Sequence, residues 1–201
     1  MIIDPSIAYR WELHPMAIRP IVTVADDDPV LRRPAERVRR IDRAVRALMD
    51  DMIETMRDAP GVGLAAPQVG QAVRVIVVEV PTDPDDPESE MRLHALADPE
   101  ILWRSPEIEE DQEACLSIPG LYGDVPRHVA IQVRGLDRSG RLVELEVADF
   151  EARVFQHEID HLDGILYTQR VTGPDKLYRL VKNEDGEYER QPLAGGEVPV
   201  I

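Results

Sequence analysis

A helical spacing of apolar side chains marks the part of the chain from Pro34 to Asp58. Apolar residues recur there every three or four positions, which is the period of a helix with one buried face. Pro34 suits the first turn of such a helix, and Pro60-Gly61 ends it. The pattern predicts one amphipathic helix over residues 34–58. The arginines on it are interpreted as a solvated face rather than a binding patch.

Beyond Gly61, the pattern changes to strand-like runs. Runs that are rich in β-branched residues, or that alternate apolar with polar residues, occupy residues 73–80, 92–97, 128–136 and 142–147. Ser139-Gly140 between the last two runs predicts a hairpin turn. Residues 81–90 are rich in proline and acidic side chains, which predicts an exposed loop to which we assign no function.

A second helix follows the strand-like runs. It is predicted to extend from Phe150 to about Leu162, with Asp149 as its N-cap. Gly164 directly beyond this stretch is typical of a helix end.

The two ends of the chain carry weaker patterns. Residues 1–17 show no period and are predicted to be an N-terminal extension, either flexible or upstream of a true start at Met16. Residues 171–201 are predicted to form a C-terminal tail. Two strand-like runs within this tail favour a small hairpin.

Length and charge restrict the class of protein. The 201 residues give room for about one domain. With 23 Lys plus Arg against 39 Asp plus Glu, the net charge is −16, so direct nucleic-acid binding is not expected. No apolar run approaches the ~20 residues that span a bilayer, and no leader pattern opens the chain. We therefore expect no membrane partner and a cytoplasmic location. Cys115, the single cysteine, agrees with a reducing compartment.

The second helix contains the H-E-x-x-H arrangement, as His157-Glu158-Ile159-Asp160-His161. Residues four apart lie on one helix face, so the two imidazoles can share one divalent metal. Glu158 lies on the adjoining arc, where it can act on a water held by the metal without being a ligand. The blander interpretation is a pair of surface histidines with ordinary hydrogen bonds.

A catalytic metal of this kind takes a third protein ligand and keeps one open position. Downstream carboxylates could supply it, as in zincin proteases; the candidates are Asp175, Glu184 and Glu187. Upstream, Cys115 lies in the segment E-A-C-L-S. A thiolate with two imidazoles suits Fe(II), Zn, Co or Ni better than Mg or Ca, and we prefer Cys115. A lone cysteine is otherwise often a small buried hydrophobe.

A third segment, residues 61–68, has the sequence G-V-G-L-A-A-P-Q. Its small residues would let a substrate backbone approach closely, and Gln68 ends it with an amide donor. Taken alone, such a run is usually just a turn before a strand.

Together and in this order, G-V-G-L-A-A-P-Q, E-A-C-L-S and Q-H-E-I-D-H-L-D-G resemble the signature motifs of the peptide deformylase family. The likeness extends over most of residues 18–170, which we expect to be the catalytic domain. It implies an α+β fold with antiparallel β-sheets around a central helix carrying HEIDH, and one further N-terminal amphipathic helix. It also implies a bacterial enzyme that removes the formyl group from the N-terminal formylmethionine of nascent polypeptides, with release of formate.

The resemblance implies a role for each matching residue. Metal ligands fall on Cys115, His157 and His161, with one divalent cation per chain, Fe(II) in the cell and Zn, Ni or Co as alternatives. The acid/base falls on Glu158. Oxyanion donors fall on the Gln68 side chain and the Leu116 N–H. Substrate-binding positions fall on Val62, Gly63 and Ala114, with Gly63 pairing to the peptide as an added strand. An ion pair that braces the cysteine loop falls on Glu113 and Arg127.

Two further residues and two departures complete the likeness. Phe150 and Val154, which precede the histidines on the same side of the helix, either line a methionine side-chain pocket or belong to the core. Ala114 replaces a glycine of the family motif. If this position needs a positive φ, the alanine side chain would strain the loop; if it needs only a close approach of the substrate, the side chain would slightly narrow the groove. The tail is neither clearly helical nor basic, so it does not support ribosome docking by the family's C-terminal route.

Two rival functions are also compatible with the sequence. One is a zincin-type endopeptidase that uses the two histidines and a downstream carboxylate. The other is an inactive module of the same fold that only holds a metal.

Overall fold

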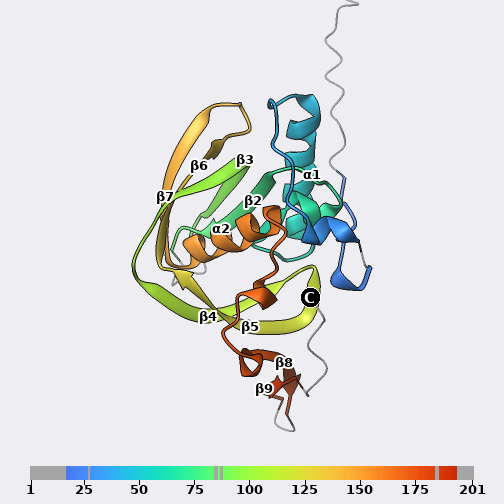
Figure 1. The fold of residues 1–201 in the computed structure, drawn as a ribbon, viewed down its shortest axis with the longest axis vertical. Helices are drawn as coiled ribbons and strands as arrows, with labels where there is room; N and C mark the ends of the chain where they lie inside the picture. The colour runs from blue at the N-terminus through green and yellow to red at the C-terminus, as the bar shows by residue number, and fades with distance from the viewer. Residues whose placement is uncertain (1–16, 27, 84–85, 87, 184–185, 194–201) are drawn as a thin grey trace, which may run out of the picture.

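The computed structural model describes residues 17–26, 28–83, 86, 88–183 and 186–193 (Figure 1). The predicted start at Met16 and nearly all of the predicted extension lie outside the described residues, as does part of the predicted loop over 81–90. Two antiparallel sheets and two α-helices make up the fold of the described residues. None of the helices within these ranges is long and apolar enough to cross a membrane.

The larger sheet has five strands in the order β1-β2-β3-β6-β7, with every neighbouring pair antiparallel. The strands are β1 Gly63–Ala65, β2 Val75–Pro81, β3 Met91–Arg104, β6 Ala130–Leu136 and β7 Leu142–Ala148. Strand β3 extends beyond its predicted run and shows two register shifts against β6, where the sheet bends.

The smaller sheet has the order β4-β5-β8-β9. Its strands are β4 Ile108–Cys115, β5 Ile118–His128, β8 Leu177–Lys182 and β9 Tyr188–Pro192. Strand β4 was not predicted, because its largely acidic and exposed sequence has no apolar alternation to signal a strand. Strands β8 and β9 pair with each other in the tail, at the bottom of Figure 1.

The first helix is shorter than its pattern predicted. Helix α1 spans Arg43–Asp58, and the chain from residue 34 to 42 is not helical. Asp42 starts the helix by accepting hydrogen bonds from the Ala44 and Val45 N–H groups. The preceding segment is instead held to the sheet, since the Val38 N–H donates to Asp98. The apolar residues of the extended segment 34–42 happen to continue the helical spacing of those in α1, so the sequence predicted one longer helix.

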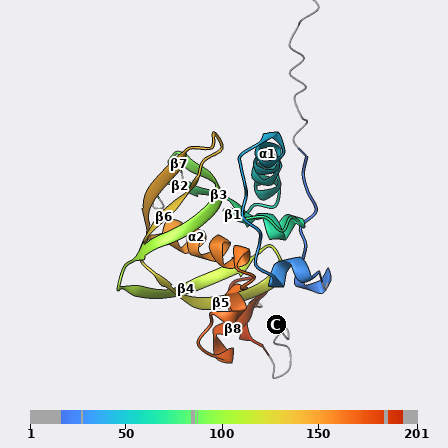
Figure 2. The same ribbon diagram turned by 45° about the horizontal axis from the view of Figure 1, so that its top comes forward.

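Helix α2, Asp149–Leu162, lies at the centre of the molecule, enclosed by both sheets (Figure 2). Strand β2 is covered on both faces. Ile76, Val78 and Val80 pack in the cluster that includes α2, while Val75 and Val77 pack in the cluster that includes α1. Burial on both faces explains why this strand is a continuous apolar run rather than an alternating one.

Short 3₁₀ turns complete the described fold. They are Val24–Asp26, Pro29–Arg32, Ala66–Val69, Tyr167–Gln169 and Pro174–Lys176.

Candidate metal centre

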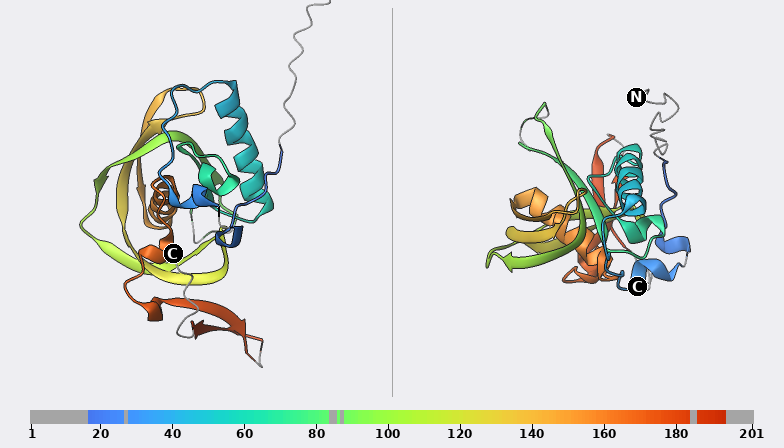
Figure 3. Two further views of the ribbon diagram at one scale, coloured as in Figure 1. Left: turned by 45° about the vertical axis from the view of Figure 1, so that its right-hand side comes forward. Right: turned by 90° about the horizontal axis from the view of Figure 1, so that it is seen from above.

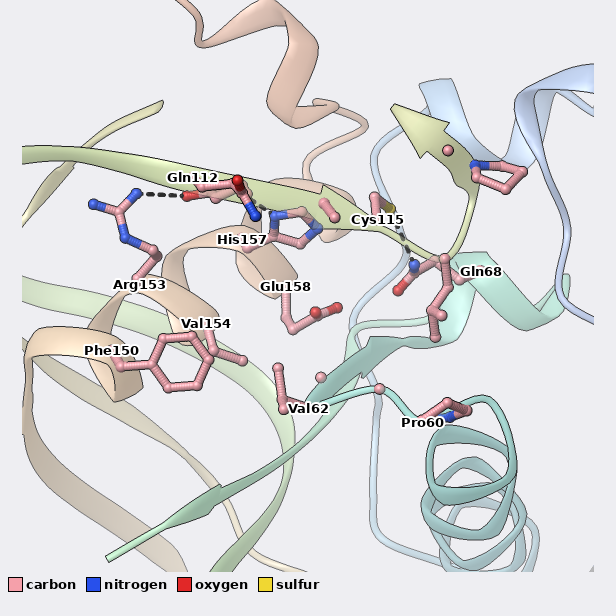
Figure 4. Close-up of a pocket in the computed structure, with 17 residues that line it drawn as sticks. Pro60, Val62, Gln68, Gln112, Cys115, Phe150, Arg153, Val154, His157 and Glu158 are labelled. Atoms are coloured by element: carbon pink, nitrogen blue, oxygen red, sulfur yellow. Dashed lines mark hydrogen bonds and ion pairs between the residues drawn. The ribbon is translucent and has the colours of Figure 1, made fainter. Parts of the chain in front are cut away.

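The three motifs converge between β1, the end of β4 and α2 (Figure 4). Helix α2 presents His157 and His161 one turn apart, with both side chains buried. Strand β4 ends at Cys115, where the register with β5 shifts and the chain turns back within three residues. This turn holds the cysteine sulfur against the helix.

Three donor atoms, one each from Cys115, His157 and His161, lie within 4.8 Å of one another. The Cys115 Sγ is 3.2 Å from the His161 Nε2. A tetrahedral cation at about 2.3 Å from sulfur and about 2.1 Å from nitrogen holds such donors about 3.6 Å apart, so little movement is needed to bind one. The soft sulfur and nitrogen donors suit a transition metal or zinc. The residues present therefore fit a divalent cation.

No described carboxylate lies close enough to both histidines to bind the same metal ion. The zincin alternative required one of Asp175, Glu184 or Glu187 in that place. Asp175 and Glu187 do not join the cluster, and Glu184 lies outside the described residues. The cysteine is the third donor that the described structure brings to the histidines.

A buried carboxylate orients the first histidine. The His157 Nδ1 donates to the Glu113 Oε2 at 2.8 Å, which leaves the Nε2 for the metal. Arg127 donates to both oxygens of Glu113, at 2.8 and 3.0 Å, so the expected ion pair between these two residues is present. Burial alone would raise the pKa of Glu113, but the hydrogen bonds from His157 and Arg127 outweigh it and lower the pKa to about 2. Glu113 is therefore an anion throughout the physiological pH range.

The sequence did not reveal two further members of this network. Arg153 is buried and donates to Glu113 at 3.1 Å and to the Val125 carbonyl at 2.7 Å. Asp160 accepts from Arg127 at 2.6 Å, through a different guanidinium nitrogen from those that bind Glu113. A signal for Arg153 does exist in the sequence. It lies four residues before His157 on the same helix face, where a buried cation needs an acidic partner.

Glu158 is the acidic group at the bottom of the site. Its side chain is buried, and its Oε2 has no hydrogen-bond partner among the described residues. Burial raises the pKa of this carboxyl to about 7. A nearby divalent cation would act in the opposite direction, because positive charge favours the carboxylate.

Gly63 makes room for that carboxylate. A Cβ added at Gly63 would lie 2.4 Å from the Glu158 Oε1, closer than two such atoms can approach. The carboxylate thus rests against bare backbone of β1. Any side chain at this position would displace either Glu158 or the strand.

Gln68 points its amide nitrogen toward the cysteine. Its Oε1 accepts the Ala65 N–H at 2.8 Å, which fixes the orientation of the amide. The Nε2 then donates to the Cys115 Sγ at 3.4 Å. This donor is buried beside the candidate metal site, so it can also reach an oxygen bound there.

A cavity of about 360 Å³ opens onto these groups. All of the predicted site residues except His161 line it, and His161 lies beneath the surface. The lining members of the predicted set are Val62, Gly63, Gln68, Ala114, Cys115, Leu116, Phe150, Val154, His157 and Glu158.

Ala114 causes no backbone strain. Among the described residues other than glycine, only Asp98 and Asp149 have a positive φ, so Ala114 needs no left-handed conformation. It lies in β4 opposite Tyr122 and is exposed at the cavity wall. The expected strain in the loop is therefore absent, and a slightly narrower groove is the remaining expected effect of this alanine.

Comparison with known proteins agrees with this site. A family model for polypeptide deformylase matches residues 18–177. A peptide deformylase from Symbiobacterium thermophilum is 47% identical over 184 residues, which cover 92% of this chain and 78% of that protein. One from Alkaliphilus metalliredigens is 47% identical over 156 residues, covering 78% of this chain and 98% of that protein.

Solved structures show the same fold. The class I type b peptide deformylase from Acinetobacter baumannii, with Met-Ala-Ser bound, aligns with a TM-score of 0.70 and 36% identity, covering 78% of this chain and 99% of that one. The peptide deformylase from Ehrlichia chaffeensis in complex with actinonin aligns with a TM-score of 0.72 and 36% identity, covering 78% and 90%.

Two antiparallel sheets surround helix α2, which places two histidines beside a thiolate and a buried carboxylate. This arrangement defines a metal-binding hydrolase. Within that class, the family model that matches residues 18–177 is decisive, together with relatives that are 47% identical and matched over 78% and 98% of their length. The chain belongs to the peptide deformylase family, and its enzyme class is that of a metal-dependent deformylase.

Proposed function

We propose that this enzyme removes the formyl group from the N-terminal formylmethionine of nascent polypeptides and releases formate. The observation that carries the proposal is the buried carboxylate of Glu158 beside the Cys/His/His donors, in the wall of the cavity. Its Oε2 has no hydrogen-bond partner among the described residues. The Acinetobacter baumannii relative with bound Met-Ala-Ser supports a peptide that begins with methionine. A cytoplasmic, bacterial location stays a prediction.

Cys115, His157 and His161 would hold the cation, and we propose Fe(II), with Zn, Ni or Co as compatible alternatives. When bound, the cation supplies positive charge that acidifies water and polarises the formyl carbonyl. Glu113 and Arg127 keep the His157 ring oriented for this.

Glu158 moves the proton. It accepts one from the attacking water as the new C–O bond forms at the formyl carbon, and it delivers that proton to the nitrogen as the C–N bond breaks. The products are formate and a free amine. A formyl carbon bears only hydrogen, so a tight pocket at the reacting carbon would admit a formyl group and exclude bulkier acyl groups.

The remaining site residues bind and orient the peptide. Gln68 and the Leu116 N–H would stabilise the charge that develops on the formyl oxygen. Val62, Gly63 and Ala114 would accept the peptide backbone as an added strand. Phe150 and Val154 line the cavity on α2 and would contact the methionine side chain.

We expect Gln68→Ala to lower kcat by about 100-fold with little change in KM, because its donor acts on charge that appears only in the transition state. The measurement is steady-state formate release from formyl-Met-Ala-Ser. Gln112→Ala, at the rim of the same cavity, is the control and should change KM at most. A Gln68→Ala enzyme with wild-type kcat would contradict the oxyanion role.

We expect Gly63→Ala to lower kcat/KM by about 100-fold or more while the metal content is kept, because the added methyl displaces the Glu158 carboxylate. Gly61→Ala is the matched control. Its Cβ would meet the flexible end of Leu116 at 3.0 Å rather than a carboxylate, so it should lose far less activity. Equal losses in the two variants would show that the close approach to Glu158 is unimportant.

One experiment tests the function as a whole. The protein is purified without oxygen, its metal content is measured, and formate release from formyl-Met-Ala-Ser is followed on the same sample. Metal-dependent formate release supports the proposal. Bound metal without formate release would favour the inactive module, and cleavage of internal bonds in unformylated peptides would favour the endopeptidase.

A further inference from the structure

The C-terminal hairpin belongs to the same sheet as one wall of the metal-site cavity. Strand β8 pairs with β5, with Tyr178 opposite Tyr122. In the left view of Figure 3, the hairpin of β8 and β9 (dark red) continues this sheet at the bottom of the molecule. At the other edge of the sheet, β4 contributes Gln112 and Ala114 to the cavity lining. The order β4-β5-β8-β9 therefore connects the tail to the cavity.

Tyr178 reaches from the hairpin to that wall. Its side chain is buried. Its hydroxyl lies 2.9 Å from the Asp124 Oδ1 and 3.0 Å from the Gln112 Oε1, and it shares its proton between these two oxygens. Gln112 and Asp124 are themselves opposite each other in β4 and β5. One hydroxyl from the tail thus joins three strands of the sheet at a residue that lines the cavity.

Neighbouring side chains hold Tyr178 in place. Arg190 of β9 lies over its ring, 4.3 Å from the ring centroid, and donates to the Asp124 Oδ2 at 2.8 Å. Tyr122 stacks against the ring, with the centroids 6.2 Å apart and 13° between the planes. Burial, and then the hydrogen bond to the Asp124 carboxylate, raise the pKa of Tyr178 to about 12. The hydroxyl therefore keeps its proton throughout the physiological pH range.

The hydrogen bond from Tyr178 leaves the other end of the Gln112 amide free. The amide oxygen is engaged by the hydroxyl, whereas the Nε2 has no hydrogen-bond partner among the described residues. Gln112 is exposed, and Figure 4 shows it on β4 at the edge of the cavity. The Nε2 of a glutamine carries N–H donors, and their direction is fixed once the oxygen is held. Gln112 therefore offers oriented donors to a molecule in the cavity.

The edge of β4 is open at this point. Within the described chain, β5 is the strand that pairs with β4, and the opposite edge has no strand beside it. Arg153 donates to two carbonyls of β4, those of Glu109 at 2.8 Å and Asp111 at 3.3 Å. Residues 112–115 follow directly, and all of them line the cavity. An open strand edge accepts a peptide as an added strand, and the carbonyls of that peptide are acceptors for amide donors.

Ordering Gln112 in advance favours binding of such a peptide. An exposed glutamine ordinarily samples several rotamers, and binding that immobilises it costs conformational entropy. The bond to Tyr178 meets this cost within the folded protein. Asp124 alone could accept the tyrosine proton, so the bond to Gln112 is not required to satisfy the buried hydroxyl.

We propose that Tyr178 is a positioning residue for the peptide substrate, which orders the Gln112 amide so that it binds a carbonyl of the incoming chain. The hairpin of β8 and β9 is then part of the peptide-binding groove. This inference rests on the proposed action on formylated peptides. Gln112 is not among the groups assigned to the chemical step, so the effect of Tyr178 falls on peptide binding and not on turnover.

The test compares variants of the full-length, metal-loaded protein. Y178F removes the hydroxyl and keeps the ring. Y188F is the matched control, because it makes the same change in the same hairpin at a tyrosine that is 66% exposed and whose hydroxyl has no hydrogen-bond partner among the described residues. Q112A and the double variant Q112A/Y178F complete a cycle. For each protein, kcat and KM are measured on formyl-Met-Ala-Ser, and Kd for unformylated Met-Ala-Ser by calorimetry, with metal content and the thermal unfolding midpoint on the same sample.

We expect Y178F to raise KM and Kd by about three- to tenfold, the effect of one hydrogen bond, with kcat and metal content near wild type. Y188F should match the wild type. Q112A should raise KM and Kd by a similar factor, and adding Y178F to Q112A should raise them no further, because Tyr178 acts through Gln112.

Four results would overturn the proposal. They are an unchanged KM and Kd in Y178F, an equal rise in Y188F, a further rise when Y178F is added to Q112A, and a loss of metal or kcat in Y178F together with a lower unfolding midpoint, which would reveal a merely structural role. Failure of the proposed function is seen separately, as absence of formate release by the wild-type protein. The Kd values for Met-Ala-Ser decide the role of Tyr178 in that case as well.

Discussion

Glu158→Gln is expected to lower kcat for formate release by about 10³-fold while the protein still binds its metal. An amide has nearly the shape of the carboxylate but cannot accept the proton of the attacking water. The Glu158 Oε2 has no other partner among the described residues, so the structure around it should be preserved. The measurement is kcat on formyl-Met-Ala-Ser, with metal content determined on the same preparation.

Glu151→Gln is the matched control for this substitution. Glu151 lies on the same helix but pairs with Arg92 and His94, and it does not line the cavity. It should keep nearly all activity. If Glu158→Gln retained more than a tenth of the wild-type kcat, another group would have to carry the proton, and the assignment of Glu158 would be wrong.

Cys115→Ser is expected to weaken metal binding by more than about 100-fold and to abolish deformylase activity at ordinary metal concentrations. The substitution replaces a soft thiolate by a neutral hydroxyl. Losing a residue that only orients a metal ligand lowers metal affinity by about 10- to 100-fold, and losing a ligand itself should lower it further. Metal affinity is measured by competition with a chelator, and folding by the thermal unfolding midpoint. The small change in side-chain size should leave the fold intact.

Ala114→Ser provides the comparison for Cys115→Ser. It adds a hydroxyl to the neighbouring exposed position of β4 and keeps the thiolate, so it should retain the metal. The zincin alternative makes the opposite prediction for Cys115→Ser, because its ligands would be the two histidines and a carboxylate. Wild-type metal affinity in Cys115→Ser would therefore refute the cysteine as the third ligand.

The sequence was most informative where chemistry requires a fixed spacing. The four-residue separation of His157 and His161 places both rings on one side of any helix, whatever surrounds it. It was least informative between residues 34 and 42, where Val38 continued a helical period although it packs from an extended segment. Strand β4 gave no pattern because it lies at a sheet edge with exposed acidic side chains.

The supporting network was only partly predictable. The family motif pointed to Glu113 and Arg127, and the structure joins them by two hydrogen bonds. Arg153 and Asp160 complete the network from α2, yet their partners in it, Glu113 and Arg127, lie 40 and 33 positions away along the chain. The helical spacing of Arg153 and His157 shows that this arginine needs an acidic partner, but it does not say which one, because the pairs form only when β4 and β5 pack on the helix.

The order of residues along the chain was enough to specify the chemical groups of this protein: two imidazoles and a carboxylate on one helical turn, a single thiolate, and one amide after a run of small residues. Folding in three dimensions was needed to bring the thiolate to the imidazoles, to point Gln68 at the sulfur, and to place Glu158 against the bare backbone of Gly63. The difference is one of range. Helical periodicity is set by bonds between near neighbours, whereas a metal site is assembled by packing between segments that are separated by some 40 or more residues.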